Sequence, residues 1–240
     1  MKLETVKGKH ILIAGATGTI GSETAKLLAA SGAQLYLAGR NAENLLSVAQ
    51  ACQVSSSHTF VADFANEKDV AIMAEKIHAM TPQIDILVNA AGVGIIKPLE
   101  QLSVQDFRQS LESNLIGAFN LVRAFLPKMK LSGQGLIINI PGVLGKVPMA
   151  GAAAYSASKY GLVGMMQSVR EELKRTHIRI TNIFLGGVDS AFWDTIDLRV
   201  QREKMIQSQE AARAIWFLCQ QPTSAVVSEM VLQPFNHQAL

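Results

Sequence analysis

Two residues suited to acid–base chemistry, Tyr155 and Lys159, lie four positions apart in the sequence. On a helix this spacing places both side chains on one face, where their polar ends can approach each other. A free phenol has a pKa of about 10, and a nearby ammonium favours the anion and lowers that pKa. The tyrosine can then exchange a proton with a carbonyl or alcohol oxygen. The pair is a candidate catalytic site, although Tyr-x-x-x-Lys alone is also a frequent chance pattern of helices.

A glycine-rich stretch at 10–28 is the candidate binding site. It starts as an apolar run typical of a buried strand, turns through Gly15, Gly18 and Gly21, and continues as a helical pattern. Glycine tolerates unusual backbone angles and keeps no side chain between the backbone and a ligand. The free N–H groups and positive dipole end of the following helix favour a phosphate. The stretch predicts a dinucleotide-binding turn, with an ordinary tight turn as the alternative.

The elements that must position these residues alternate along the chain. We expect strands at 11–14, 34–38, 58–62, 84–88, 135–140, 178–184 and 225–232, and helices at 23–28, 42–52, 67–78, 104–129, 152–175 and 209–219. This alternation predicts an α/β fold of the Rossmann type: a doubly wound parallel sheet of about seven strands with helices on both faces. We expect one domain over 1–240, with a partly helical flap at 189–207. Ligands should bind at the carboxyl ends of the strands.

Composition narrows the possible partners and compartments. The 240 residues are 49% apolar, enough for one substantial core, and the net charge is only +3, from scattered basic residues that form no nucleic-acid-binding stripe. Cys52 and Cys219 lie far apart without neighbouring histidines, so we expect reduced thiols and no metal site. The first ten residues are polar, and the next apolar run is too short for a signal peptide or membrane span. We therefore expect a cytoplasmic protein that binds neither nucleic acid nor membranes.

The order of three motifs resembles that of the short-chain dehydrogenase/reductase family, in its single-domain branch, over nearly the whole chain. These motifs are the glycine turn, Asn89-Ala90-Ala91-Gly92 after the fourth expected strand, and Tyr155-Ser156-Ala157-Ser158-Lys159. The resemblance implies an oxidoreductase that moves a hydride between NAD(P)(H) and a carbonyl or alcohol. It also implies a homodimer or homotetramer, which we expect to form through the helices at 104–129 and 152–175.

The resemblance also implies a set of cofactor-binding residues. An arginine at position 40, ending the second expected strand, offers a cationic fork to a 2′-phosphate and favours NADP(H) over NAD(H), with a solvated loop arginine as the alternative. Asp63 is expected beside the adenine, although a helix-capping aspartate would look the same. Val188 and Ser190 match the positions that bind the nicotinamide carboxamide. The full expected set is Gly15, Thr17, Gly18, Ile20, Gly21, Arg40, Asp63, Asn89, Ala91, Gly92, Tyr155, Lys159, Val188 and Ser190.

The implied catalytic set is Tyr155 as acid/base, Lys159 as its electrostatic tuner and ribose anchor, and Asn114 as part of a proton relay through water. The family serine, thirteen positions before the tyrosine, is replaced here by Gly142. Losing one preorganised donor to a developing oxyanion costs on the order of a hundredfold to a thousandfold in rate. A substrate hydroxyl, an ordered water or a backbone N–H around Val143 are possible replacements. Leu185 also stands where the family has a proline.

These features support two functions from different classes. The first is an NADP(H)-dependent reductase or dehydrogenase of a small to medium, fairly apolar carbonyl or alcohol, with Met149, Phe192 and Trp193 lining its pocket. Core packing or a subunit contact would explain those three residues equally well. The alternative function is a catalytically impaired NADP(H)-binding sensor or assembly protein, which the glycine at 142 and Leu185 favour.

Overall fold

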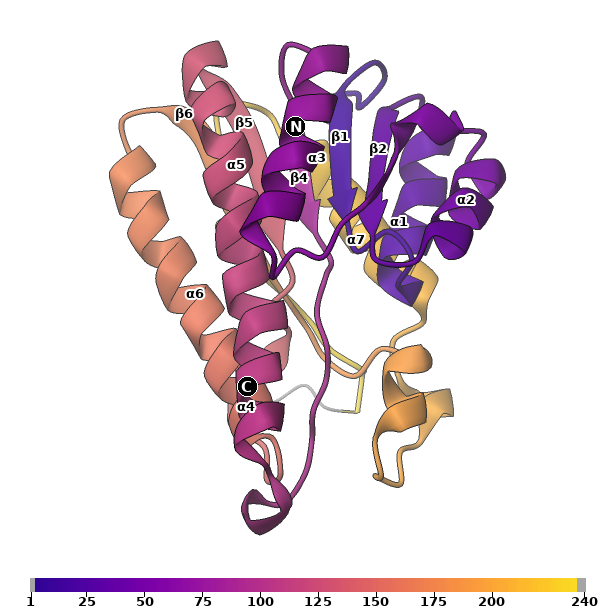
Figure 1. Ribbon diagram of the computed structural model, residues 1–240, viewed down its shortest axis with the longest axis vertical. Coiled ribbons are helices and arrows are strands. Elements are labelled where there is room, and N and C mark those ends of the chain that lie inside the picture. The colour runs from indigo at the N-terminus through magenta and orange to yellow at the C-terminus, as the bar shows by residue number, and fades with distance from the viewer. Residues whose placement is uncertain (1–2, 237–240) are drawn as a thin grey trace.

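A parallel sheet of seven strands runs through the centre of the protein, seen in the computed structural model, which describes residues 3–236 (Figure 1). The strands lie in the order β3-β2-β1-β4-β5-β6-β7, and every neighbouring pair is parallel. Their bounds are β1 His10–Ala14, β2 Gln34–Gly39, β3 Thr59–Val61, β4 Ile86–Asn89, β5 Gln134–Asn139, β6 His177–Leu185 and β7 Glu229–Leu232. The predicted doubly wound α/β fold is confirmed, and its topological switch point lies between β1 and β4.

Helices cover both faces of the sheet, because the strands are apolar on both sides. In β1, Ile11 and Ile13 face one layer of the core, whereas Leu12 faces the other. The first layer includes α1 Thr19–Ala30, α2 Ala42–Ala51 and α7 Ser208–Cys219. The second includes α3 Glu67–Met80, α5 Gly117–Ser132 and α6 Ala153–Leu173, and Figure 1 shows α5 and α6 on the side of the sheet away from α1 and α2.

The expected long helical region at 104–129 is confirmed, and it contains a π-helical turn. It consists of α4 Val104–Leu111, a π-helical turn Glu112–Ile116, and α5, which continues to Ser132. Glycine at position 133, in the left-handed conformation with φ 75°, ends α5. A π turn inserts one extra residue into a helix, and the sequence contains no motif from which its position could be predicted.

The last strand is shorter than expected, starting at Glu229 rather than at 225. Two side chains of β6 donate hydrogen bonds to backbone carbonyls of the segment before β7. Arg179 donates to the Ala225 carbonyl, and Thr181 donates to the Val227 carbonyl. These backbone groups are therefore bonded outside the strand ladder.

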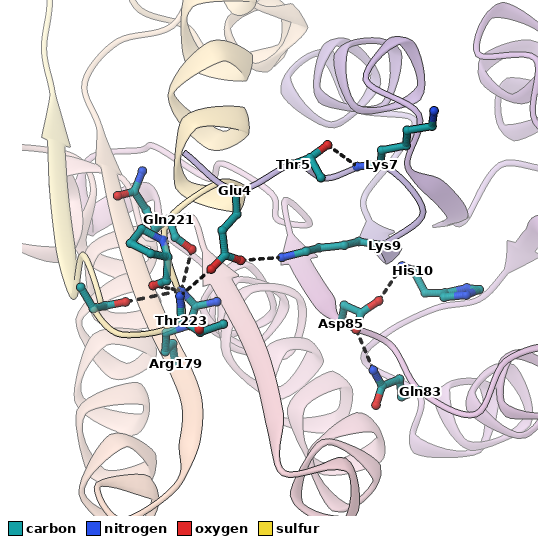
Figure 2. Close-up of polar contacts among 12 residues, drawn as sticks. Glu4, Thr5, Lys7, Lys9, His10, Gln83, Asp85, Arg179, Gln221 and Thr223 are labelled. Atoms are coloured by element: carbon teal, nitrogen blue, oxygen red, sulfur yellow. Dashed lines mark hydrogen bonds and ion pairs between the residues drawn. The ribbon is translucent and has the colours of Figure 1, made fainter. Parts of the chain in front are cut away.

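A network of polar contacts closes the amino-terminal edge of the sheet (Figure 2). Glu4 accepts a hydrogen bond from the Thr223 N–H at 2.9 Å and pairs with Lys9 at 3.2 Å. Arg179 donates to the carbonyls of Gln221 and Pro222, each at 3.0 Å. The network ties the N-terminal segment to β6 and to the loop before β7, at the edge of the sheet opposite the expected ligand site.

The flap at 189–207 follows β6 and lies beyond the carboxyl ends of the strands, in orange below the strand arrows of Figure 1. It contains short 3-10 turns at Ala191–Thr195 and Arg202–Lys204, so the partly helical prediction is confirmed. Its base is closed by a parallel bridge between Val188 and Ile206. Over the part of the chain that the structure describes, no helix combines the length and apolar character needed to cross a membrane.

Candidate active site

The glycine turn connects β1 to α1 at the carboxyl edge of the sheet. Gly15 has φ +84°, and a Cβ there would lie 2.6 Å from the Ala91 nitrogen. A Cβ on Gly21 would overlap the Gly15 carbonyl, so both positions require glycine. Gly18 is the N-cap of α1, and the nearest atom to a Cβ there is the Gly15 oxygen at 3.4 Å. The turn thus packs tightly against the sheet and leaves the N-terminus of α1 available to a phosphate.

A cavity of about 190 Å³ lies beside this turn, and its lining contains seven of the predicted cofactor residues: Gly15, Thr17, Gly18, Arg40, Asp63, Ala91 and Gly92. Arg40 is exposed, and within residues 3–236 no carboxylate forms an ion pair with it. Asp63 accepts from the Ala65 N–H at 3.1 Å, so it caps the local turn and also lines the cavity. A guanidinium, a carboxylate and exposed backbone groups therefore lie together at this edge of the sheet, where the adenosine end of a dinucleotide is expected.

The loop after β4 is held by Asn89, whose side chain donates to the Asn139 Oδ1 at 3.3 Å and accepts from the Ala91 N–H at 3.4 Å. Gly92 follows and allows a close approach of two polar groups. A Cβ there would lie 2.8 Å from the Asn114 Oδ1 and 3.4 Å from the Lys159 Nζ. The absence of a side chain at this position therefore brings α6 and the π turn together at the cavity edge.

The π turn directs Asn114 into the interior, where 2% of its surface is exposed. Its amide accepts from the Val93 N–H at 2.8 Å and donates to the Val93 carbonyl at 3.0 Å. It also donates to Ser158 Oγ at 2.9 Å, and Ser158 in turn donates to the Tyr155 carbonyl at 2.7 Å. Sequence reasoning missed Ser158, whose signal was a small polar residue on the buried face of the helix, three positions after the tyrosine.

The first turns of α6 bring Tyr155 and Lys159 together, with the Lys159 Nζ 5.5 Å from the centre of the Tyr155 ring. Lys159 is 4% exposed and donates to the Ile140 carbonyl at 3.0 Å. Burial lowers the pKa of the Lys159 ammonium to about 8. Burial also raises the pKa of the Tyr155 phenol above its ordinary value. Desolvation disfavours the charged phenolate, and the expected lowering of this pKa by the ammonium together with an oxidised nicotinamide stays a prediction.

The backbone conformation at Gly142 disfavours any residue with a side chain, including the serine of the family. Gly142 has φ 69° and ψ 171°, a conformation that is essentially restricted to glycine. Its carbonyl accepts from the Gly145 N–H at 3.0 Å and closes the 3-10 turn Val143–Gly145. A Cβ there would meet only the Leu185 oxygen, at 3.5 Å. Space is therefore available for a side chain, but the backbone conformation opposes one.

A larger cavity of about 480 Å³ opens beside Tyr155. Ile20, Val188 and Ser190 line it, as do Met149, Phe192 and Trp193, so the prediction that the last three border an apolar pocket is confirmed. The lining also includes residues that sequence reasoning missed, most of them on the flap: Ile96, Leu144, Arg199, Val200, Lys204 and Met205. The irregular flap has no periodicity from which the orientation of its side chains could be predicted.

Comparisons with known proteins agree with this geometry. The family model of the short chain dehydrogenases matches residues 9–200, and the chain belongs to this family of oxidoreductases. An uncharacterized oxidoreductase of Staphylococcus epidermidis is 30% identical over 230 residues, covering 95% of this chain and 98% of the relative.

Two solved structures extend the comparison. A metagenomic short-chain oxidoreductase in complex with NADP has a TM-score of 0.82 and 29% identity, covering 96% of this chain and 99% of that one. A 7α-hydroxysteroid dehydrogenase complexed with NADH has a TM-score of 0.86 over 96% of this chain and 94% of that one. At 24% identity this second structure supports the fold alone.

Proposed function

We propose that the protein is an NADP(H)-dependent carbonyl reductase or alcohol dehydrogenase acting on a small to medium, fairly apolar substrate. The observation that carries this proposal is that Asn114 and Lys159 converge on Gly92, while Tyr155 lies beside Lys159 and lines an apolar cavity of about 480 Å³. A buried acid–base group beside an apolar cavity suits a substrate whose only reactive polar group is the carbonyl or hydroxyl oxygen.

The bound nicotinamide would supply or accept the hydride, and the protein would handle the proton. In reduction, the Tyr155 hydroxyl donates its proton to the carbonyl oxygen. Lys159, held by the Ile140 carbonyl, keeps positive charge near the resulting phenolate and anchors the nicotinamide ribose. Asn114 fixes the Val93 backbone and would help to order the water through which a proton from solvent returns to the Tyr155 phenolate.

The proposed preference for NADP(H) depends on Arg40. Arg40 lines the smaller cavity together with Asp63, and within residues 3–236 it forms no ion pair with a carboxylate. The solved relatives do not decide the cofactor, because one contains NADP and the other NADH. Replacing Arg40 with serine should weaken NADPH binding about tenfold or more, since a charged hydrogen bond contributes about 1.5–3 kcal/mol, and leave NADH binding unchanged. Fluorescence titration of both cofactors measures this, and equal weakening of the two would contradict the assignment.

A second candidate function is an NADP(H)-binding sensor or assembly protein without turnover. The conformation of Gly142 favours it, because the backbone is shaped for glycine where relatives place a catalytic hydroxyl. Consumption of NADPH over a panel of aldehydes and ketones separates the two functions. Steady turnover supports the reductase and shows that a substrate hydroxyl, water or backbone N–H replaces the serine. Tight NADPH binding without turnover supports the sensor.

We also propose a cytoplasmic homodimer or homotetramer, assembled through α4, α5 and α6. Large apolar side chains are exposed on these helices and on the π turn between two of them. Phe107 is 37% exposed, Ile116 and Phe119 are each 42% exposed, and Tyr160 is 45% exposed. Large apolar side chains left exposed on these helices support the expected contact helices.

A further inference from the structure

The Phe192 ring on the flap rests on Gly94, in the segment that leaves β4. A Cβ added to Gly94 would overlap the Cε2 and Cζ atoms of this ring. Gly94 does not have a positive φ, so its backbone would accept alanine. The Phe192 ring therefore requires a glycine at position 94, and this glycine leaves a recess that the ring fills.

The same ring also contacts the catalytic tyrosine. The centres of the Phe192 and Tyr155 rings are 5.7 Å apart, with an angle of 52° between their planes. Phe192 also meets Trp193 edge-on, at 5.1 Å and 80°. Phe192 thus fills the space between the Gly94 recess and Tyr155, at the border of the larger cavity.

The protein holds this ring in place through the base of the flap. The Trp193 indole donates to the Val188 carbonyl at 2.9 Å, and the Ala191 N–H donates to the Thr19 Oγ1 at 3.4 Å. Val188 itself is bridged to Ile206. Both sides of the turn that carries Phe192 are therefore anchored to the cofactor-binding edge of the sheet.

We propose that Phe192 determines which carbonyl compounds reach Tyr155, because its ring occupies the space that one carbonyl substituent would need. Only a hydrogen or a methyl group fits on that side. The larger apolar substituent lies along Ile96, Leu144 and Met149 on the rest of the cavity wall. The substrate class is thus aldehydes and methyl ketones, and this inference rests on the proposed reductase function.

The first test compares acetophenone with butyrophenone, which differ only in the smaller substituent, using NADPH as reductant. Phe192→Ala should raise the ratio of kcat/KM for butyrophenone to that for acetophenone about tenfold or more, because added methylenes in an apolar site are discriminated by that order. Phe192→Leu should give an intermediate ratio. Met149→Ala is the matched control, since it widens another part of the cavity and should change KM for both ketones alike. An unchanged ratio in Phe192→Ala would overturn the inference.

Two further measurements do not need turnover. Gly94→Ala should lower the Tm by about 2–10 °C, and should have no such effect in the Phe192→Ala background, where the ring is gone. Trp216→Phe leaves Trp193 as the only tryptophan, so its fluorescence reports binding of the two ketones with NADP⁺ present. If no carbonyl is reduced, the proposed function fails, while this titration still decides whether Phe192→Ala favours butyrophenone. A change in NADPH affinity with no change in ketone preference would place the ring at the cofactor and contradict the inference.

Discussion

Substitution of Gly142 by serine tests whether the missing family hydroxyl can be restored at this backbone. With φ 69° and ψ 171°, Gly142 lies in a region where a side chain costs about 1–3 kcal/mol of conformational strain. Steric overlap adds little, because the nearest atom to the new Cβ is the Leu185 oxygen at 3.5 Å. For a chain of this length each kcal/mol corresponds to about 2–4 °C in Tm. Gly142→Ser should therefore lower Tm by about 2–12 °C.

Two matched variants separate strain from the chemistry of the hydroxyl. Gly142→Ala has the same strain without a hydroxyl, so it should be as destabilised as Gly142→Ser. Gly164→Ala lies within α6 with no atom within 4 Å of the new Cβ, so it should be stabilised by about 0.4–1 kcal/mol.

Thermal unfolding and NADPH-dependent turnover are measured on all four proteins. We expect Gly142→Ser to be no more active than Gly142→Ala, because a strained or rearranged backbone does not aim the hydroxyl at the substrate. A serine variant as stable as the wild type, or one whose turnover rises by the hundredfold or so that a single oxyanion donor contributes, would refute this reasoning.

Three other predictions follow from burial, charge and exposure. Lys159→Met should abolish turnover yet stabilise the protein by up to about 3 kcal/mol at neutral pH, since burial lowers the lysine pKa from 10.5 to about 8. The gain should shrink as the pH rises through that range, where the wild-type ammonium loses its proton, and a loss of stability in urea unfolding would contradict it. Asp106→Asn should destabilise the protein at neutral pH, because the hydrogen bond from Lys97 lowers the pKa of Asp106 to about 2. The difference in Tm should disappear as the pH falls from about 3.8 to 2, where the wild-type carboxylate is protonated, and a pH-independent difference would contradict it. Phe119→Asp should reduce the molar mass in light scattering to that of a monomer, whereas Leu131→Asp, at the far end of the same helix, should not.

The sequence was sufficient to predict the fold and to propose which residues lie at the carboxyl edge of the sheet, for physical reasons seen in particular elements. The run from Ile11 to Ala14 is apolar on both faces and is fully buried, so its strand could be predicted from composition. Close backbone contacts require glycine at positions 15 and 21, and the spacing of these glycines can be recognised in the sequence. Tyr155 and Lys159 lie on one face of a helix, and this can be predicted from their spacing of four residues.

Other features depend on tertiary contacts that no local pattern encodes. Asn114 enters the site through a π turn, for which the sequence contains no motif. The conformation of Gly142 depends on the turn that it starts, so the sequence shows a glycine at this position but not a backbone that opposes a side chain. The recess at Gly94 exists only because the flap, nearly a hundred residues later in the chain, returns Phe192 to it.

Turnover by Tyr155→Phe, measured with a carbonyl that the wild type reduces and with saturating NADPH, tests the central claim most directly. The variant keeps the ring that packs against Phe192 and loses only the hydroxyl, so NADPH binding should be unchanged. A positioned general acid contributes about a hundredfold to ten-thousandfold, and kcat should fall by that order. A Tyr155→Phe protein as active as the wild type would contradict the assignment of Tyr155 as the proton donor.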